Sequence, residues 1–392
     1  MSALTRSPGS RRAQLLRPLE LAGLMAEART AGALDIAIGT PPGEPPPVAV
    51  EAAVRALRGR HNQYGDAAGF GGLRQMVADR LYRTRGTRID PDTEVTITSG
   101  AIEGLLVSLL ACTDPGDEVI VVEPAFEIYS GAVQVAGGCP VPVALDGPDW
   151  RLDTQRVREA MTGRTRAIVV NSPQNPTGRV FDRAEVDALL RLCAEHDVIC
   201  LFDAVYDNFL FDDNEFVSPL DSPVGRGTSV VLGSLSKANQ MSGWRLGYCV
   251  APPELTRVLR AVHERTTFGA AAPLQVGAAA AADPSCAAED FRANRDLMTD
   301  RLRGMGFQVT APEGGWFLLG GTTGLGWASD ELATALVREA GVLVAPGTPF
   351  FSDRGEGRRW IRTTFVKDPA VTAEALDRLA SFLREHRPPR AR

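Results

Sequence analysis

The sequence predicts an α/β fold whose large domain contains a mostly parallel sheet flanked by helices, with a smaller α+β domain at the C-terminal end. Two observations support this prediction. Between about residues 95 and 251, short apolar runs rich in β-branched residues alternate with helical stretches, as in parallel sheets that are buried on both faces. From about residue 286, a long helical stretch is followed by short apolar segments and a last helix, which indicates a second, α+β unit.

Length and composition indicate a globular protein of about two domains. The chain has 392 residues, of which 44% are hydrophobic and 23% charged, so disorder of the whole chain is excluded. A net charge of −6 gives no electrostatic indication of nucleic-acid binding. We expect a cytoplasmic protein without a membrane span or a metal. The sequence has no apolar run of 18 residues, no signal-type segment, no CxxC pair and no metal-type histidine spacing.

The N-terminal part precedes the first predicted strand. Residues 12–30 are predicted to form one helix, because leucine and methionine side chains recur with helical spacing. The segment 36–47, IAIGTPPGEPPP, contains five prolines and must be an ordered turn or a connection. We therefore predict three parts: residues 1–45, a helix and connecting segment that packs with the small domain; residues 46–285, the large domain; and residues 286–392, the small domain.

The predicted elements of the large domain are six strands and the helices between them. One helix begins at Asp182, with Glu185 three residues later in a capping-box arrangement. In the small domain we expect a helix within 288–306, short strands near GWFLLGG and VLVAPG, and a last helix at about 370–386. The six strands are expected at 94–98, 118–123, 167–171, 198–203, 229–234 and 246–251.

Polar residues follow five of these strands. Ligands of open α/β sheets bind outside the carboxyl ends of the strands, so we expect these residues to surround one crevice. They supply glycine-rich backbone, an aromatic ring, an amide side chain, a carboxylate and a lysine. Together they describe a site for a planar, phosphorylated cofactor that carries an aldehyde.

Lys237 and Asp203 are the candidate reactive groups. The chain has only two lysines, and Lys237 directly follows an apolar strand, whereas Lys367 precedes the last helix and is expected to be solvated. An amine that attacks a carbonyl must be neutral, which a desolvated lysine near other cations can be. A buried carboxylate at Asp203 would keep a ring nitrogen protonated, and a protonated pyridine stabilises a carbanion.

A phosphate site is predicted beside Lys237. Arg245 supplies a planar, permanently charged group, and Ser234 supplies a hydroxyl. The backbone amides of Ala101 and Ile102, at a helix start opened by glycine, provide further donors for an anion.

Five motifs resemble the class I/II aminotransferases, which are fold-type I enzymes dependent on pyridoxal 5'-phosphate (PLP). The resemblance extends over essentially the whole chain. It implies a PLP-dependent transferase that moves an amino group between an L-amino acid and a 2-oxo acid by ping-pong chemistry through an aldimine at Lys237. The motifs are HNQYGDAAGFGGLR (61–74), VEPAFEIY (122–129), NSPQNPTG (171–178), FDAVYD (202–207) and GSLSKANQMSGWRLGY (233–248).

The resemblance implies a role for each matching residue around the cofactor ring. Lys237 matches the lysine that carries the cofactor and moves the proton, and Asp203 matches the partner of the pyridinium nitrogen. Asn175 and Tyr206 match residues that hydrogen-bond the cofactor's O3'. Phe126 stands where an aromatic ring stacks on the pyridine.

The resemblance also implies the surroundings of the phosphate and the substrate. Ser234, Arg245 and the amides of Ala101 and Ile102 match the phosphate site. Tyr64 matches a tyrosine that reaches the phosphate of the neighbouring subunit, which implies a homodimer.

Substrate contacts are implied at three positions. Arg362, within WIRTTF, matches the arginine that grips the substrate α-carboxylate. Gly39 matches a backbone contact near that carboxylate, and Asn175 also belongs to the substrate-binding set.

The sequence departs from the family pattern at three positions, and two alternative functions stay open. Ala204 replaces a usual acid, Asn239 a common aromatic, and Ile102 a frequent hydroxyl residue.

A PLP enzyme of this fold could instead perform β/γ-elimination, replacement or cyclisation, as 1-aminocyclopropane-1-carboxylate synthases do with a sulfonium amino acid. The third reading is a ligand-sensing module of a transcription regulator. Such modules follow a DNA-binding domain, and only about 35 residues precede IAIGTPP.

Overall fold

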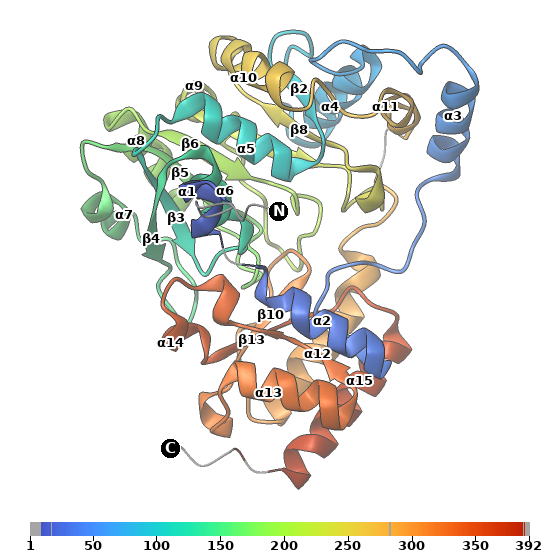
Figure 1. Ribbon diagram of the computed structural model, residues 1–392, viewed down its shortest axis with the longest axis vertical. Coiled ribbons are helices and arrows are strands. Elements are labelled where there is room, and N and C mark those ends of the chain that lie inside the picture. Colours follow the sequence, from blue (N-terminus) through green and yellow to red (C-terminus); the bar gives the residue numbers. More distant parts are fainter. Residues whose placement is uncertain (1–8, 17, 282–283, 387, 389–392) are drawn as a thin grey trace, which may run out of the picture.

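A seven-stranded sheet forms the centre of the molecule. The computed structural model describes residues 9–16, 18–281, 284–386 and 388. The strand order is β2-β8-β7-β6-β5-β3-β4, and all strands run parallel except β8, which is antiparallel to both neighbours. This sheet lies in the upper part of Figure 1, with helices on its faces. Its strands are β2 (Val95–Thr98), β3 (Glu118–Glu123), β4 (Cys139–Ala144), β5 (Thr165–Asn171), β6 (Ile199–Asp203), β7 (Ser229–Ser234) and β8 (Gly247–Val250).

The six predicted strands of this sheet are confirmed, each within two residues at its ends, because their apolar side chains are buried on both faces. The sequence analysis missed β4. This strand lies at the sheet edge and pairs only with β3. It contains Pro140 and Pro142, which cannot donate ladder hydrogen bonds and are tolerated at an edge.

The helices around the sheet follow the expected local signals where those signals are strong. The capping box at Asp182 and Glu185 is formed at the start of α8. The helices of this part are α3 (Pro47–Arg58), α4 (Gly71–Arg85), α5 (Ala101–Cys112), α6 (Ile128–Ala136), α7 (Thr154–Ala160), α8 (Arg183–Glu195), α9 (Pro223–Thr228), α10 (Pro253–Thr266) and α11 (Ala272–Ala279), with short helices η1 (Pro219–Asp221) and η2 (Ser242–Trp244).

The predicted single helix over residues 12–30 is wrong. The chain forms α1 (Arg11–Leu15) and α2 (Glu20–Ala31), separated by a segment that contains Pro18. Proline lacks the backbone N–H and its ring clashes with the preceding turn, so the helix is interrupted there. As a result α1 lies beside α6, whereas α2 packs near the C-terminal elements (Figure 1).

The C-terminal part contains a four-stranded sheet, β12-β13-β10-β9, and a two-stranded parallel sheet in which β1 from the N-terminal segment pairs with β11. The predicted helix within 288–306 and the last helix are confirmed as α12 and α15. The strands are β1 (Leu34–Asp35), β9 (Gln308–Val309), β10 (Phe317–Gly321), β11 (Val342–Leu343), β12 (Ala345–Pro346) and β13 (Trp360–Thr364). The helices are α12 (Glu289–Gly304), α13 (Ser329–Ala335), α14 (Arg354–Gly357) and α15 (Pro369–Glu385), with short helices η3 (Thr323–Leu325), η4 (Leu336–Ala340) and η5 (Thr348–Phe350).

A hydrogen bond and an ion pair connect the N-terminal segment to this C-terminal part. The amide of Thr364 donates to the carbonyl of Ile36 over 2.8 Å. Lys367 Nζ lies 3.1 Å from Asp35 Oδ2, and its side chain is only 14% exposed. The expectation that Lys367 is solvated is therefore wrong, because the segment after β1 brings a carboxylate to it.

Candidate active site

A cavity of about 270 Å³ lies at the carboxyl ends of the parallel strands of the seven-stranded sheet. Because β8 runs in the opposite direction, it begins at this end of the sheet, which brings Arg245 to the residues that follow the other strands. The cavity is lined by every site residue named from the sequence except Tyr64: Gly39, Ala101, Ile102, Phe126, Asn175, Asp203, Tyr206, Ser234, Lys237, Arg245 and Arg362.

Lys237 projects into this cavity just after β7. Its Nζ lies 4.8 Å from the ring centre of Trp316 and 5.5 Å from that of Tyr206. Burial lowers the pKa of Lys237 to about 8, although the carboxylate of Asp203 opposes the decrease. Lys237 is therefore much easier to deprotonate than an exposed lysine, as a nucleophilic amine requires.

Asp203, the last residue of β6, is a buried carboxylate with two hydrogen-bond donors. The hydroxyl of Tyr129 donates to Oδ2 over 2.6 Å, and the amide of Val205 donates to Oδ1 over 3.1 Å. Burial raises the pKa of Asp203, while the hydrogen bond from Tyr129 opposes the increase. Such a carboxylate can hold a positively charged ring nitrogen, which would in turn favour the ionised form.

The start of α5 provides an anion site. Gly100 precedes the helix with φ 82°, a conformation that favours glycine. A Cβ at this position would lie 2.5 Å from Nη2 of Arg245, so glycine leaves room for the guanidinium beside the amides of Ala101 and Ile102. Across the site, Ser234 Oγ accepts a 3.0 Å hydrogen bond from the amide of Ser236.

A carboxylate behind this helix start holds its backbone in place. Glu103 accepts hydrogen bonds from the amide of Ser99 over 2.7 Å and from the hydroxyl of Thr267 over 2.8 Å, and it pairs with Nδ1 of His263 at 2.7 Å. Burial alone would raise the pKa of Glu103, but these contacts outweigh it and the pKa is lowered. His263, on α10, is fully buried.

Arg362 reaches the same cavity from β13 of the C-terminal sheet. Its guanidinium donates to the backbone carbonyl of Ala37 over 2.9 Å and to Oδ1 of Asn175 over 3.1 Å. It stacks over Phe317, with 4.1 Å between the guanidinium carbon and the ring centre. Its Nε is buried and has no hydrogen-bond partner in the part of the chain that the structure describes. This arrangement leaves donors for a carboxylate.

Gly39 forms part of the wall near this guanidinium. A Cβ at Gly39 would lie 2.7 Å from the ring of Phe317, so the chain can pass close to the ring only without a side chain. Tyr206 packs against Trp316 and Phe317, with ring centres 5.7 and 6.1 Å apart. Burial raises the pKa of the Tyr206 hydroxyl, and this hydroxyl forms no hydrogen bond with the described residues.

Tyr64 is not brought into this cavity. Its side chain is 92% exposed and contacts Phe268, with ring centres 5.6 Å apart. Phe268 is itself 47% exposed. The two rings therefore form a small aromatic projection on the surface.

The three departures from the family pattern lie in different surroundings. Ala204 is buried and belongs to the core around the large sheet. Asn239 is 2% exposed. Ile102 is 43% exposed and lines the cavity, so an apolar side chain faces the site where a hydroxyl is frequent.

Sequence reasoning missed several residues of the site. Ser236, Asn171 and Tyr129 lie within the quoted motifs, so a motif signal existed for each of them. Asn171 accepts from the amide of Asn175 and donates to the carbonyl of Asp203. Trp316 had no such signal, because only the packing of the C-terminal sheet against the cavity brings it to Lys237.

The residues present fit PLP. An amine with a lowered pKa, a buried carboxylate and an arginine with an unpaired Nε converge on one cavity.

In the described residues, no group of three His, Cys, Asp or Glu side chains is placed to hold a metal ion. None of the helices described there is long and apolar enough to cross a membrane.

Comparisons with known proteins show which family this chain is similar to. A family model described as aminotransferase class I and II matches residues 31–383. The probable N-succinyldiaminopimelate aminotransferase of Mycobacterium tuberculosis is 33% identical over 377 residues, which cover 92% of this chain and 94% of that protein. Kynurenine–oxoglutarate transaminase 1 of Rattus norvegicus is 32% identical over 380 residues, which cover 86% and 89%.

Solved structures show the same similarity. N-succinyldiaminopimelate aminotransferase from Mycobacterium tuberculosis matches with a TM-score of 0.90 and 31% identity, over 95% of this chain and 99% of that chain. YbdL from Escherichia coli, with a methionine aminotransferase function, matches with a TM-score of 0.90 and 28% identity, over 96% and 100%.

Proposed function

The chain belongs to the class I and II aminotransferases, and we propose that Lys237, Asp203, Tyr206 and Arg362 carry out the transamination that this family performs. The expected fold type, cofactor and reaction class are confirmed: the protein is a PLP-dependent aminotransferase that moves an amino group between an amino acid and a 2-oxo acid. The observation that carries the residue assignment is the position of Lys237 in the cavity with a pKa lowered to about 8.

Lys237 supplies the amine and the proton carrier of the reaction. Bound PLP supplies an aldehyde that condenses with an amine and a ring that withdraws electrons from the substrate's Cα. The pKa of Lys237 is about 8, so at slightly alkaline pH a large fraction of the protein molecules carries a neutral Lys237 amine. This amine can accept a proton from Cα. Trp316 and Tyr206 lie beside Nζ and exclude water from it.

Asp203 holds the ring nitrogen in its protonated form. Tyr129 and the amide of Val205 fix the carboxylate in place and favour its charged state. Asn175, Tyr206 and Phe126 line the same cavity; in the bound state Asn175 and Tyr206 would hydrogen-bond the O3' oxygen and Phe126 would stack on the ring.

Arg362 binds the α-carboxylate of the substrate. Its orientation is fixed by the carbonyl of Ala37 and the ring of Phe317, so the loss of side-chain freedom on binding is small. The backbone at Gly39 borders the same position.

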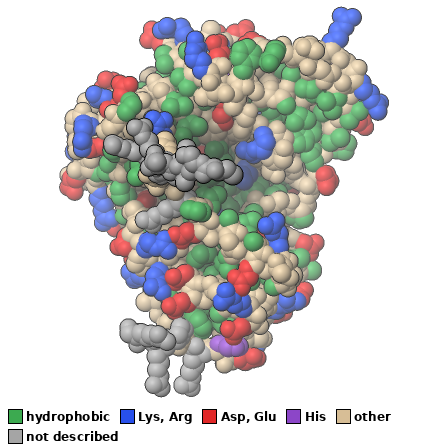
Figure 2. Space-filling view, viewed as in Figure 1, with side chains coloured by type: hydrophobic (Ala, Val, Ile, Leu, Met, Phe, Trp, Pro, Cys, Tyr) green, Lys and Arg blue, Asp and Glu red, His purple; other side chains and the backbone are tan. Residues whose placement is uncertain are grey.

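Arg245, Ser234 and the amides of Ala101 and Ile102 hold the phosphate, and Tyr64 of a second copy completes that site. Two observations support a homodimer. Tyr64 and Phe268 project from the surface. Hydrophobic side chains gather over α3 in the upper right of Figure 2, where Val48, Val50, Val54 and Leu57 are exposed (Figure 2). Apolar patches of this kind mark interfaces between proteins.

We also propose the three-part division at residues 45 and 285. Support comes from the buried clusters: two consist mostly of side chains around the large sheet, and two join the N-terminal segment, through Ile36 and Leu21, to C-terminal elements. A cytoplasmic location is proposed on the six cysteines, which are all free.

The test is a single-turnover experiment on the purified, PLP-loaded protein. Adding an amino acid without an acceptor should convert the cofactor from its aldehyde form to pyridoxamine phosphate, and a 2-oxo acid should restore the original absorbance. Consumption of the amino acid while the cofactor stays in its aldehyde form would instead indicate elimination or replacement.

A further inference from the structure

A second cavity, of about 750 Å³, adjoins the cofactor cavity. The two cavities share Ile102, Phe126, Glu127 and Ile128 in their walls. Phe126 is the residue proposed to stack on the cofactor ring, so the shared wall lies directly beside the reacting centre. A group attached to the substrate's Cα would enter the second cavity past these four shared residues.

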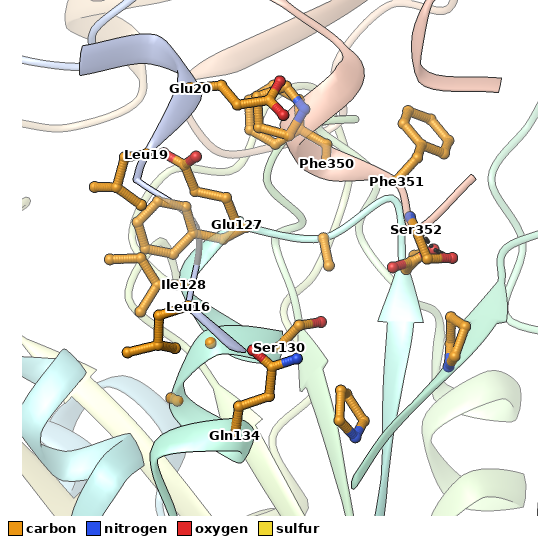
Figure 3. A pocket seen from close by; sticks show the side chains of 18 of the residues that line it. Leu16, Leu19, Glu20, Glu127, Ile128, Ser130, Gln134, Phe350, Phe351 and Ser352 are labelled. Atoms are coloured by element: carbon orange, nitrogen blue, oxygen red, sulfur yellow. Dashed lines mark hydrogen bonds between the residues drawn. The ribbon is translucent and has the colours of Figure 1, made fainter. Parts of the chain in front are cut away.

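One wall of this second cavity is apolar. The segment between α1 and α2 contributes Leu16 and Leu19, which are 38% and 49% exposed, and Phe350 and Phe351 form another part of the wall (Figure 3). Covering such exposed leucines with an apolar group removes apolar surface from water and therefore stabilises the complex.

A second wall is formed by α6 and its N-terminal flank, where polar side chains lie among small and apolar ones. Glu127, Ser130 and Gln134 recur at spacings of three and four residues and line the cavity together (Figure 3). The opposite face of α6 carries Tyr129 and Val133, which are buried in the core. The cavity thus combines polar side chains of this wall with an apolar wall.

Among the three acids that border the cavity, Glu127 differs from the others. Glu123 accepts hydrogen bonds from the amide and hydroxyl of Ser352 over 2.9 and 2.8 Å. Glu20 accepts from the hydroxyl of Thr348 over 2.8 Å. The Glu127 carboxylate receives no hydrogen bond from the described residues; burial raises its pKa, and the charge of the Arg362 guanidinium only partly opposes this increase. A partly buried carboxylate without a donor is costly unless a ligand supplies one.

From this juxtaposition we propose that the second cavity binds the side chain of a large, mainly apolar amino donor that carries an N–H group for Glu127, a chemistry represented by tryptophan. The inference rests on the proposed function, because Arg362 and Lys237 must fix the Cα end of the substrate. The apolar body of the side chain covers the leucines, and its N–H donates to the Glu127 carboxylate. An acidic side chain is disfavoured, because it would bring a second negative charge to Glu127, while Arg354, which also lines the cavity, is already paired with Glu20.

The first test compares kcat/KM of the PLP-loaded protein for tryptophan, phenylalanine, alanine and aspartate with one 2-oxo acid. We expect tryptophan to exceed aspartate by at least about tenfold, since a hydrogen bond to a charged group is worth about that factor. Activity with aspartate equal to or above that with tryptophan would overturn the proposal.

The second test removes the charge. Glu127→Gln should lower the ratio of kcat/KM for tryptophan over aspartate by about tenfold. Glu123→Gln is the matched control, because that side chain borders the same cavity but is hydrogen-bonded to Ser352, and it should leave the ratio unchanged. An equal effect of both variants, or none from Glu127→Gln, contradicts the assignment.

The third test fills the cavity. A Cβ at Gly131 of α6 would meet only Leu16, at 3.9 Å, so the side chain of Gly131→Leu occupies part of the cavity without a backbone clash, and leucine favours the helix. It should lower kcat/KM for tryptophan by about tenfold relative to alanine, which is comparable to the discrimination that a hydrophobic pocket gives by size. An unchanged tryptophan-to-alanine ratio would show that the side chain lies elsewhere.

Failure of the proposed function gives a different result. In that case, none of the four amino acids converts the cofactor to pyridoxamine phosphate. Rapid conversion with aspartate but not with tryptophan leaves the transamination intact and overturns only the assignment of the second cavity.

Discussion

The two walls of the candidate active site are built in different ways. On the wall of the large sheet, Asp203 is already hydrogen-bonded by Tyr129, and the start of α5 is held by Glu103. On the C-terminal wall, Arg362 is oriented by Ala37 and Asn175 but keeps an unpaired Nε. The first wall is thus complete before a substrate arrives, whereas the second leaves donors for it. Changes to the reacting groups on the first wall should slow the chemistry with every substrate, and changes on the second should weaken binding.

The largest effect is expected at Lys237. Lys237→Ala should lower turnover by about a thousandfold or more with every amino acid, because both the amine and the proton carrier are lost. Steady-state turnover and circular dichroism would separate loss of chemistry from loss of fold. Lys367→Ala is the control, since the only other lysine pairs with Asp35 away from the cavity and should retain turnover. Normal turnover of the Lys237 variant would refute the assignment.

Asp203→Ala should have the next largest effect. The variant should still bind PLP but turn over about 10²–10³-fold more slowly, because one preorganised electrostatic contact to the ring is lost. Tyr129→Phe removes only the 2.6 Å hydrogen bond and should act more weakly. It should also raise the pKa of Asp203 further, so the acidic limb of the pH–kcat profile should move to higher pH. A loss of only a few-fold in Asp203→Ala would mean that another group protonates the ring.

Arg362→Ala tests the second wall. It should raise KM for the amino acid by about 30-fold or more, because loss of a charge-assisted contact to a buried carboxylate costs about 2–5 kcal/mol. PLP affinity, measured by fluorescence titration, should be unchanged. Arg359→Ala, which changes a half-exposed neighbour paired with Glu356, should leave KM alone. Loss of cofactor from the Arg362 variant would place this arginine at the phosphate instead.

The smallest effect concerns the support behind the first wall. The pKa of Glu103 is lowered in the folded chain, so its carboxylate stabilises the fold above its unfolded pKa, and this contribution is lost as the pH falls through the lower folded value. Glu103→Gln should lower the free energy of unfolding by about 1–3 kcal/mol near neutral pH. Urea titrations of the two proteins should converge at low pH. A constant difference at all pH values would show that the charge of Glu103 is not involved.

The sequence predicted the large sheet well because each strand is buried on both faces and therefore apolar along its length. The edge strand β4 was missed since Pro140 and Pro142 interrupt that pattern. The helix over 12–30 was predicted too long because the apolar spacing continues across Pro18, although the backbone cannot. The apolar spacing favours one continuous helix there, but the proline interrupts it, because its ring and its missing N–H prevent the helix from continuing.

Within the site, the first wall was more predictable than the second. Lys237, Asp203 and Ser234 follow strands directly, so their convergence follows from the sheet topology. Trp316 beside Lys237 depends on how the C-terminal sheet packs, and Asp35 beside Lys367 on the path of the N-terminal segment. No local pattern encodes contacts that are formed between segments so far apart in the chain.

The second cavity has a consequence for how this protein can change in evolution. Its walls come mainly from the α1–α2 segment, the exposed side of α6 and the loop around Phe350; it shares Ile102 and Phe126 with the cofactor cavity, but the proposed reacting groups Lys237 and Asp203 do not line it. If this cavity binds the substrate side chain as proposed, mutations at Leu16, Gly131 or Glu127 alter which amino acid is accepted and leave Lys237 and Asp203 unchanged. The preferred amino acid can then change by single mutations, each of which leaves the enzyme active.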